Sequence, residues 1–174
     1  NQTKAATIAI ADYHGPVYLR FGRPVVPVFI SEGTPFVIGK ALVLNEGADV
    51  SIFATGHMVW KAIEAGHQLA ARGIDAEIIN IHTIKPLDAE AILQSVRKTG
   101  CAVTAEEHQL HGGLGDAVAH VLAVNHPAPL EMVAVQDTFG ESGTPDELME
   151  KYGLTAEAIV QAAEKVLKRR AVAV

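Results

Sequence analysis

Three things that the sequence has little of exclude several classes of protein. Cys101 is the single cysteine, so no disulfide framework exists and a reducing, cytoplasmic location is expected. The 14 basic and 20 acidic residues give a net charge of −6, and no basic stripe suits nucleic acid. No apolar run is long enough to cross a bilayer, and no signal-peptide pattern opens the chain. We therefore expect neither nucleic acid nor a membrane as a partner.

What remains is a globular composition with one conspicuous stretch. Hydrophobic residues make up 49% of the 174 residues, which leaves room for one ordinary domain and a fragment of another. In Ala102–Asp116, AVTAEEHQLHGGLGD, an apolar run leads into acidic residues, histidines, a glycine-rich turn and a helical pattern. This order is typical of parallel α/β sheets, which bind ligands at the carboxyl ends of their strands. The loop is therefore either a binding site or a tight corner.

The first 39 residues do not read as a complete domain. Thr3 is a candidate helix N-cap, and Val17–Phe21 predicts a strand. A helix and one strand cannot close a core, so this part is expected to belong to another domain. Between residues 24 and 39, three prolines indicate an extended linker.

Beyond the linker, the pattern predicts a three-layer α/β domain. It has five strands at 41–44, 50–54, 76–81, 102–104 and 132–135, alternating with helices of ordinary length. That alternation indicates a mostly parallel five-stranded sheet with helices on both faces. The short first strand is expected to be an antiparallel edge strand, and residues before Gly22 are expected to lie outside the sheet. Asp88, the Thr144–Glu147 capping box and Thr155 predict three helix starts.

Four blocks of the sequence resemble transketolase. TGHMVWKAIEAGHQLAARGIDAEIINIHTIKPLD, TAEEHQLHGGLGD and DTFGESGTPDELMEKYGLT are similar to its C-terminal domain, and GPVYLRFGR is similar to the last strand of the preceding thiamine-binding pyrimidine domain. The resemblance covers essentially the whole chain. It implies that residues 1–23 end the pyrimidine domain, 24–39 form a linker and 40–174 form the transketolase C-terminal domain. The EEHQLHGGLG block is also close to 1-deoxyxylulose-5-phosphate synthase.

The resemblance also implies which parts of the enzyme lie elsewhere. Transketolases hold the cofactor diphosphate and its metal through a Gly-Asp-Gly motif, which this sequence lacks. The implied cofactors of the complete enzyme are thiamine diphosphate and Mg²⁺ (or Ca²⁺), with none bound by this segment alone and no catalytic residue in it. The implied partners are the remaining transketolase domains or a separate N-terminal subunit, in a homodimer or larger oligomer that acts on sugar phosphates.

One substrate-binding residue follows from the resemblance. Arg23, in Phe21-Gly22-Arg23-Pro24, matches the arginine that binds the substrate phosphate in the family. A guanidinium is always charged and holds phosphate oxygens in a fork. The alternative role is an ion pair between the linker and a carboxylate. Arg20 is expected to serve packing or an ion pair.

The other candidate sites have structural explanations. Glu106, Glu107, His108 and His111 could bind a metal, but their spacing is loose and favours a polar loop at a dimer contact or domain edge. Gly112–Gly115 at a helix start could bind an anion through backbone amides, or could simply be a tight corner. The remaining candidates are expected to be structural or surface residues: His57, His67, His82 and a buried Cys101.

Two functions stay open at this point. The first is the C-terminal segment of a transketolase that transfers two-carbon ketol units between sugar phosphates, itself non-catalytic and supporting dimer assembly. A start in mid-domain would then reflect truncation, proteolysis or a split gene. The second is the same domain from 1-deoxyxylulose-5-phosphate synthase or a 2-oxoacid dehydrogenase beta subunit, or a stand-alone dimerisation or anion-binding module at Glu106–Gly115.

Overall fold

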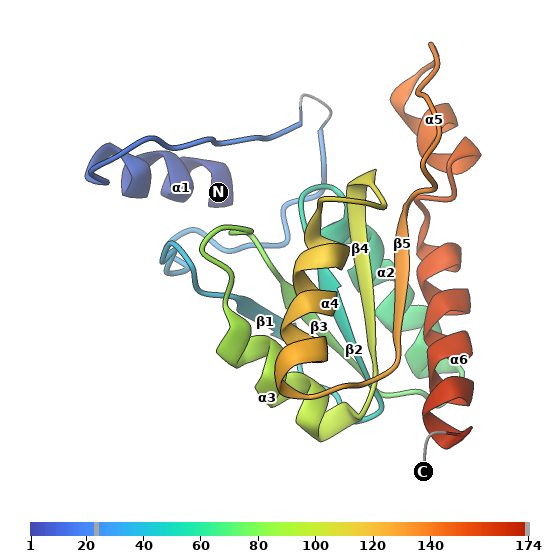
Figure 1. Cartoon of the computed structure of the whole chain (residues 1–174). Helices are drawn as coiled ribbons and strands as arrows, with labels where there is room; N and C mark the ends of the chain where they lie inside the picture. The colour runs from blue at the N-terminus through green and yellow to red at the C-terminus, as the bar shows by residue number, and fades with distance from the viewer. Residues whose placement is uncertain (23–24, 173–174) are drawn as a thin grey trace.

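The fold consists of a helix-covered sheet and an N-terminal arm. The computed structural model describes residues 1–22 and 25–172. The sheet and its helices, residues 42–172, are called the domain here, and the described residues before them are called the arm. Figure 1 shows the arm running across the end of the sheet at which β4 finishes. No helix within the described ranges combines the length and apolar character needed to cross a bilayer.

The sheet has five strands in the order β1-β3-β2-β4-β5. They are β1 (Leu42–Asn45), β2 (Val50–Ala54), β3 (Ala76–Asn80), β4 (Ala102–Gln109) and β5 (Leu130–Val135). All neighbouring pairs are parallel except β1 with β3, which confirms the mostly parallel sheet with one antiparallel edge strand. Every residue of β2 and β3 is buried, as expected of strands covered on both faces.

Helices cover both faces, which confirms the three-layer arrangement. On one face α2 (Met58–Ala71) and α6 (Ala156–Val172) pack over a core that includes Ile52 and Val103. On the other face α3 (Ala89–Thr99) and α4 (Leu114–Asn125) pack over a core that includes Phe53 and Ile79. Ile52 and Phe53 are adjacent in β2, and the alternation of side chains along a strand sends them to opposite cores.

Three predicted helix starts are confirmed. The Asp88 carboxylate accepts a hydrogen bond from the Ala91 amide at 3.2 Å and caps α3. At α5 (Pro145–Lys151), the Glu147 carboxylate accepts from the amide of Thr144 at 3.0 Å and from its hydroxyl at 2.6 Å. The Thr155 hydroxyl accepts from the Ala158 amide at 3.1 Å at the start of α6. Local capping chemistry thus sets these boundaries.

β4 is longer than the apolar pattern predicted. The predicted strand ended at Thr104, whereas β4 continues to Gln109. Its last residues are polar, but Gln109 still pairs with Val135 of β5 after an irregularity in register. Pairing with a neighbouring strand, rather than apolar character, therefore determines where β4 ends.

The arm corrects two expectations. α1 (Gln2–Ala11) begins one residue before Thr3, with Asn1 in the N-cap position, so Thr3 is not the cap. No residue described before Leu42 forms a strand, so the strand predicted at Val17–Phe21 is wrong. Its side chains favour a strand, but a strand also needs a hydrogen-bonded neighbour, and the described chain supplies none there. The division of the chain into the end of a pyrimidine domain (1–23), a linker (24–39) and a C-terminal domain (40–174) stays a prediction.

Candidate functional site

The loop after β2 lies beside the last part of β4, at the carboxyl ends of the parallel strands. Ala54 at the end of β2 is in register with Ala105 of β4, so the residues that follow Ala54 lie beside the polar last residues of β4. Ligands of open α/β sheets usually bind at this edge. Glu106 and Glu107 therefore occupy the position in which a site would be expected, and alternation along β4 directs their side chains to opposite faces.

Glu106 is a buried carboxylate that caps α4. Its side chain is almost fully buried, with Oε2 accepting from the Leu114 amide and Oε1 from the Gly115 amide, each at 2.8 Å. A negative charge at this place complements the helix dipole and satisfies amides that have no partner within the helix. A β-carbon on Gly113 would lie 2.0 Å from Oε2 of Glu106, so only glycine allows this close approach.

This contact answers the question raised by the glycine-rich loop. The Leu114 and Gly115 amides, which an external anion would need, already bind the chain's own carboxylate. The neighbouring Gly112 amide donates to the Asp116 carboxylate at 2.7 Å. The geometry therefore supports the tight-corner interpretation, with Glu106 as the internal anion.

Glu107 joins the domain to the arm. Its carboxylate Oε2 lies 3.2 Å from Nδ1 of His57, which follows β2. Its backbone carbonyl accepts a hydrogen bond from the Arg20 guanidinium at 3.1 Å. Arg20 thus contacts a backbone oxygen rather than forming the ion pair that was one of its expected roles.

His57 is the residue that sequence reasoning missed. The sequence predicts only a structural or surface role for His57, yet it contacts both Glu107 and the arm. A β-carbon on Gly22 would lie 2.1 Å from Nε2 of His57, so the arm backbone passes directly against the imidazole ring. The signal that could have found this pair is the register of two adjacent parallel strands, because His57 follows Ala54 at the end of β2 and Glu107 follows Ala105, the residue of β4 in register with Ala54.

His108 and His111, two of the candidate metal ligands, lie at the end of β4 and in the loop after it. Nδ1 of His108 lies 3.0 Å from the Gln109 carbonyl oxygen and 3.8 Å from Oε2 of Glu106, and His111 is exposed. Within residues 1–22 and 25–172, no group of three or more His, Cys, Asp or Glu side chains could hold a metal ion. The donors present do not fit a divalent cation with a diphosphate, which needs several oxygen ligands.

The structure describes the surroundings of three other candidate residues but not of a fourth. His82 packs against Phe36 of the arm, with ring centroids 4.2 Å apart, and burial lowers the pKa of its imidazole. Cys101 is fully buried, and burial raises the pKa of its thiol. His67 is exposed on α2. Arg23 lies outside the described residues.

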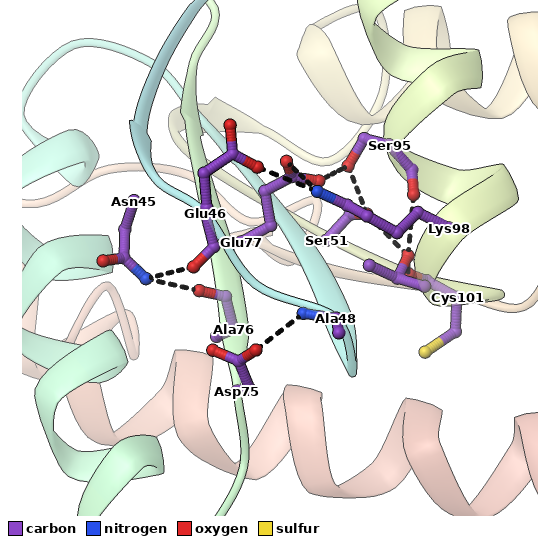
Figure 2. Close-up of polar contacts among 11 residues, drawn as sticks. Asn45, Glu46, Ala48, Ser51, Asp75, Ala76, Glu77, Ser95, Lys98 and Cys101 are labelled. Carbon is purple, nitrogen blue, oxygen red and sulfur yellow. Dashed lines mark hydrogen bonds and ion pairs between the residues drawn. The ribbon is translucent and has the colours of Figure 1, made fainter.

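A second buried carboxylate, Glu77 of β3, lies near the amino-terminal ends of the parallel strands, away from Glu106. It accepts a hydrogen bond from the Ser95 hydroxyl and lies 2.7 Å from Nζ of Lys98, which also contacts Glu46 at 2.9 Å (Figure 2). The Ser51 hydroxyl joins this group through Ser95 and Thr99. Hydrogen bonding to Glu77 and Glu46 raises the pKa of Lys98. All these partners come from the domain, so the network stabilises the contact between α3 and the sheet.

With the geometry in place, comparison with known proteins identifies the family. A family model described as the transketolase C-terminal domain matches residues 39–159. The chain belongs to the transketolase C-terminal domain family. It is 50% identical over 169 residues to a 6-deoxy-6-sulfo-D-fructose transketolase subunit of a Clostridium species, covering 97% of this chain and 52% of that protein.

Two further comparisons extend this transketolase relationship. The chain is 38% identical over 169 residues to one of the subunits of an apulose-4-phosphate transketolase of Phocaeicola vulgatus, covering 97% of this chain and 54% of that protein. A solved structure described as a split-gene transketolase, inactive beta4 tetramer, superimposes with a TM-score of 0.90 at 49% identity, covering 94% of this chain and 55% of that one. The chain thus spans about half the length of these relatives.

Proposed function

We propose that the chain is the C-terminal half of a transketolase subunit that transfers two-carbon ketol units between sugar phosphates. The observation that carries this proposal is the match to a split-gene transketolase over 94% of the chain, with a TM-score of 0.90. Relatives named as transketolase subunits match over 97% of the chain. A cytoplasmic location and a homodimer or larger oligomer are part of the proposal.

In this proposal the cofactor chemistry belongs to residues outside the chain. Thiamine diphosphate supplies the carbanion chemistry of ketol transfer when it is bound. The sequence has no Gly-Asp-Gly motif, and the described residues offer no set of metal ligands. The chain therefore contributes a folded domain and an arm, while the remaining transketolase domains or a separate N-terminal subunit hold the diphosphate and Mg²⁺ or Ca²⁺.

The chain's own contribution to substrate binding is proposed to be Arg23. Its guanidinium would hold the substrate phosphate through charge-assisted hydrogen bonds. The described residues just before it contact the domain, since Arg20 bonds to the Glu107 carbonyl and Gly22 lies against His57. The non-reacting phosphate would then supply binding energy away from the reacting carbons.

A reconstitution assay tests the proposal. Purified chain is assayed for ketol transfer from fructose 6-phosphate to an aldose phosphate, with thiamine diphosphate and Mg²⁺, before and after addition of all the remaining transketolase domains. We expect turnover only in the mixture. Turnover by the chain alone, in a preparation shown by mass spectrometry to hold nothing else, would contradict the non-catalytic role; no turnover in a stable mixed complex would contradict the transketolase assignment.

Replacing Arg23 tests the phosphate contact in the same mixture. Arg23→Ala should lower kcat/KM for the phosphorylated ketose by an amount equivalent to about 1.5–3 kcal/mol, the value of a hydrogen bond to a charged group. Unphosphorylated fructose should be affected far less. Arg97→Ala, at an exposed position on α3, is the matched control. Equal losses with both ketoses would assign Arg23 to structure instead.

A further inference from the structure

Within the described residues, β5 is an edge strand whose sequence is well suited to pairing with another strand. It stands at one end of the strand order, with β4 on its inner side, and Figure 1 places it next to α6 at the side of the domain. Its sequence, LEMVAV, is apolar apart from one glutamate and contains no proline. An edge strand of this kind can pair with the same strand of a second copy unless it is protected.

The backbone carbonyls of β5 alternate between β4 and the free edge. The Pro129 carbonyl accepts a hydrogen bond from the Ala102 amide at 3.0 Å, and the Val135 carbonyl accepts one from the Leu110 amide at 2.8 Å. The irregularity in register adds residues to β4 and none to β5, so the alternation along β5 is continuous between these two points. The residues whose carbonyl and amide groups point to the free edge are therefore Leu130, Met132 and Ala134.

Side chains cap two of these three carbonyls. Nη1 of Arg169, on α6, donates a hydrogen bond to the Leu130 carbonyl at 2.8 Å. Nε2 of Gln136, which directly follows β5, donates to the Ala134 carbonyl at 2.9 Å. The two capped carbonyls lie on either side of Met132. A second strand that paired with this edge would therefore have to displace both side chains.

Glu131 holds the Arg169 guanidinium at the edge. The Glu131 carboxylate pairs with Arg169 and lies 2.8 Å from Nζ of Lys165, one turn earlier on α6. The Glu131 side chain is 14% exposed, whereas that of Arg169 is 50% exposed. Because a guanidinium has several donors in a fixed plane, it can bind this carboxylate and the Leu130 carbonyl together. The mostly buried carboxylate thus fixes an exposed cation against the backbone of the edge strand.

We propose that Arg169 and Gln136 close the free edge of β5 to a second copy of this chain. The inference goes beyond the proposed function, because it concerns how copies meet and not the reaction. Arginine and glutamine at exposed positions contribute little to the free energy of unfolding, so stability does not account for two such donors on edge carbonyls. Blocking an edge strand is a common means by which native sheets avoid edge-to-edge pairing. The oligomer then forms through surfaces other than the β5 edge.

The test removes both donors and measures self-association of the purified chain. Sedimentation velocity of Arg169→Ala with Gln136→Ala should show added species of about double the natural mass, because pairing through one edge joins two copies. Thermal unfolding is the folding check. The matched control is Lys168→Ala with Gln161→Ala, which removes one cation and one amide group from exposed positions on α6. We expect this control to match the natural chain at every concentration.

Amide hydrogen exchange locates the new contact. In the larger species, the amides of β5 that point to the free edge should exchange roughly tenfold more slowly than in the natural chain, because a paired strand would bond to them. These are the amides of Leu130, Met132 and Ala134. An unchanged mass in the folded double variant would overturn the proposal. Larger species in which these amides exchange as fast as in the natural chain would also overturn it, since the copies would then meet elsewhere.

A second variant decides the outcome if the alanine variant does not fold. Arg169→Met with Gln136→Met keeps unbranched apolar stems at both positions and removes both donors. It should give the same larger species with the same slowed amides. A folded methionine variant with the natural mass would contradict the capping role of the two side chains.

Discussion

The domain and the arm use their apolar side chains in opposite ways. In the domain, Phe53 of β2 is fully buried against the helices α3 and α4. In the arm, Phe21 is 65% exposed and Tyr18 is 88% exposed. Figure 1 shows the same contrast in architecture, because the domain is a layered body and the arm is an extended segment after α1.

This difference indicates that the two regions have different partners. The domain buries most of its large apolar side chains in its two cores, and its buried carboxylates, Glu77 and Glu106, have hydrogen-bond partners within the domain. The arm has a strand-like sequence at Val17–Phe21 without a neighbouring strand in the described chain. We expect its apolar side chains to be covered in the assembled enzyme, since exposed apolar patches of this kind mark interaction surfaces.

The largest expected effect comes from a matched pair of phenylalanine substitutions. Phe53→Ala should lower the free energy of unfolding by about 3–5 kcal/mol, because it removes a buried aromatic side chain and leaves a cavity. Phe21→Ala should change it by less than about 0.5 kcal/mol, since that side chain is mostly exposed. Urea unfolding followed by circular dichroism measures both values. Equal destabilisation by the two substitutions would refute the contrast between domain and arm.

For oligomer assembly the order of the two effects should be reversed, with Phe21→Ala having the larger effect. Light scattering at micromolar concentration should show a dimer or larger oligomer for the natural chain, as the exposed arm requires. Phe21→Ala should shift that equilibrium toward smaller species. A monomer for the natural chain, with no other protein present, would contradict the proposed role of the arm.

The second prediction compares the adjacent glutamates. Glu106→Gln should lower the free energy of unfolding by about 1.5–3 kcal/mol, because the new amide group cannot accept both hydrogen bonds from the start of α4 and the charge is lost. Glu107→Gln should cost less than about 1 kcal/mol, as expected for a partly exposed pair. Urea unfolding of both variants under the same conditions gives the comparison. A larger cost at Glu107 would mean that the contact with the arm contributes more stability than the cap of α4.

The smallest expected effect is a pH dependence at the contact between His82 and the arm. Burial lowers the pKa of His82 from its ordinary value of 6.5, so the folded state binds this proton less readily than the unfolded state does. The contribution to stability should therefore be complete at neutral pH and be lost as the pH falls below about 6.5. His82→Gln should flatten that part of the pH profile, whereas His67→Gln, exposed on α2, should not. An unchanged profile in His82→Gln would contradict the assignment.

Much of the domain could be predicted because its signals are local. Asp88 and the Thr144–Glu147 box place helix starts through contacts within one turn, and the alternation of strands and helices gives the layered sheet. Contacts between distant segments could not be predicted in this way. His57 meets Glu107 only because β2 and β4 are adjacent in a particular register. Glu77 lies inside the predicted strand at 76–81, and its partners Ser95 and Lys98 come from α3.

The wrong strand in the arm has the same origin. Val17–Phe21 has the composition of a strand, but strand formation depends on a neighbour that the pattern itself does not contain. The glycine-rich loop shows the converse case, because two interpretations of Gly112–Gly115 were equally compatible with the sequence. Only the position of the Glu106 carboxylate distinguishes them.

The most direct test of the central claim is calorimetry of cofactor binding. The claim is that this chain supplies the domain and the arm but not the site for thiamine diphosphate and its metal. Titrating thiamine diphosphate in the presence of Mg²⁺ into the purified chain should give no saturable heat. The same titration into the chain mixed with all the remaining transketolase domains should show saturable binding. Saturable binding by the chain alone, at the same protein concentration and with no second protein present, would contradict the account.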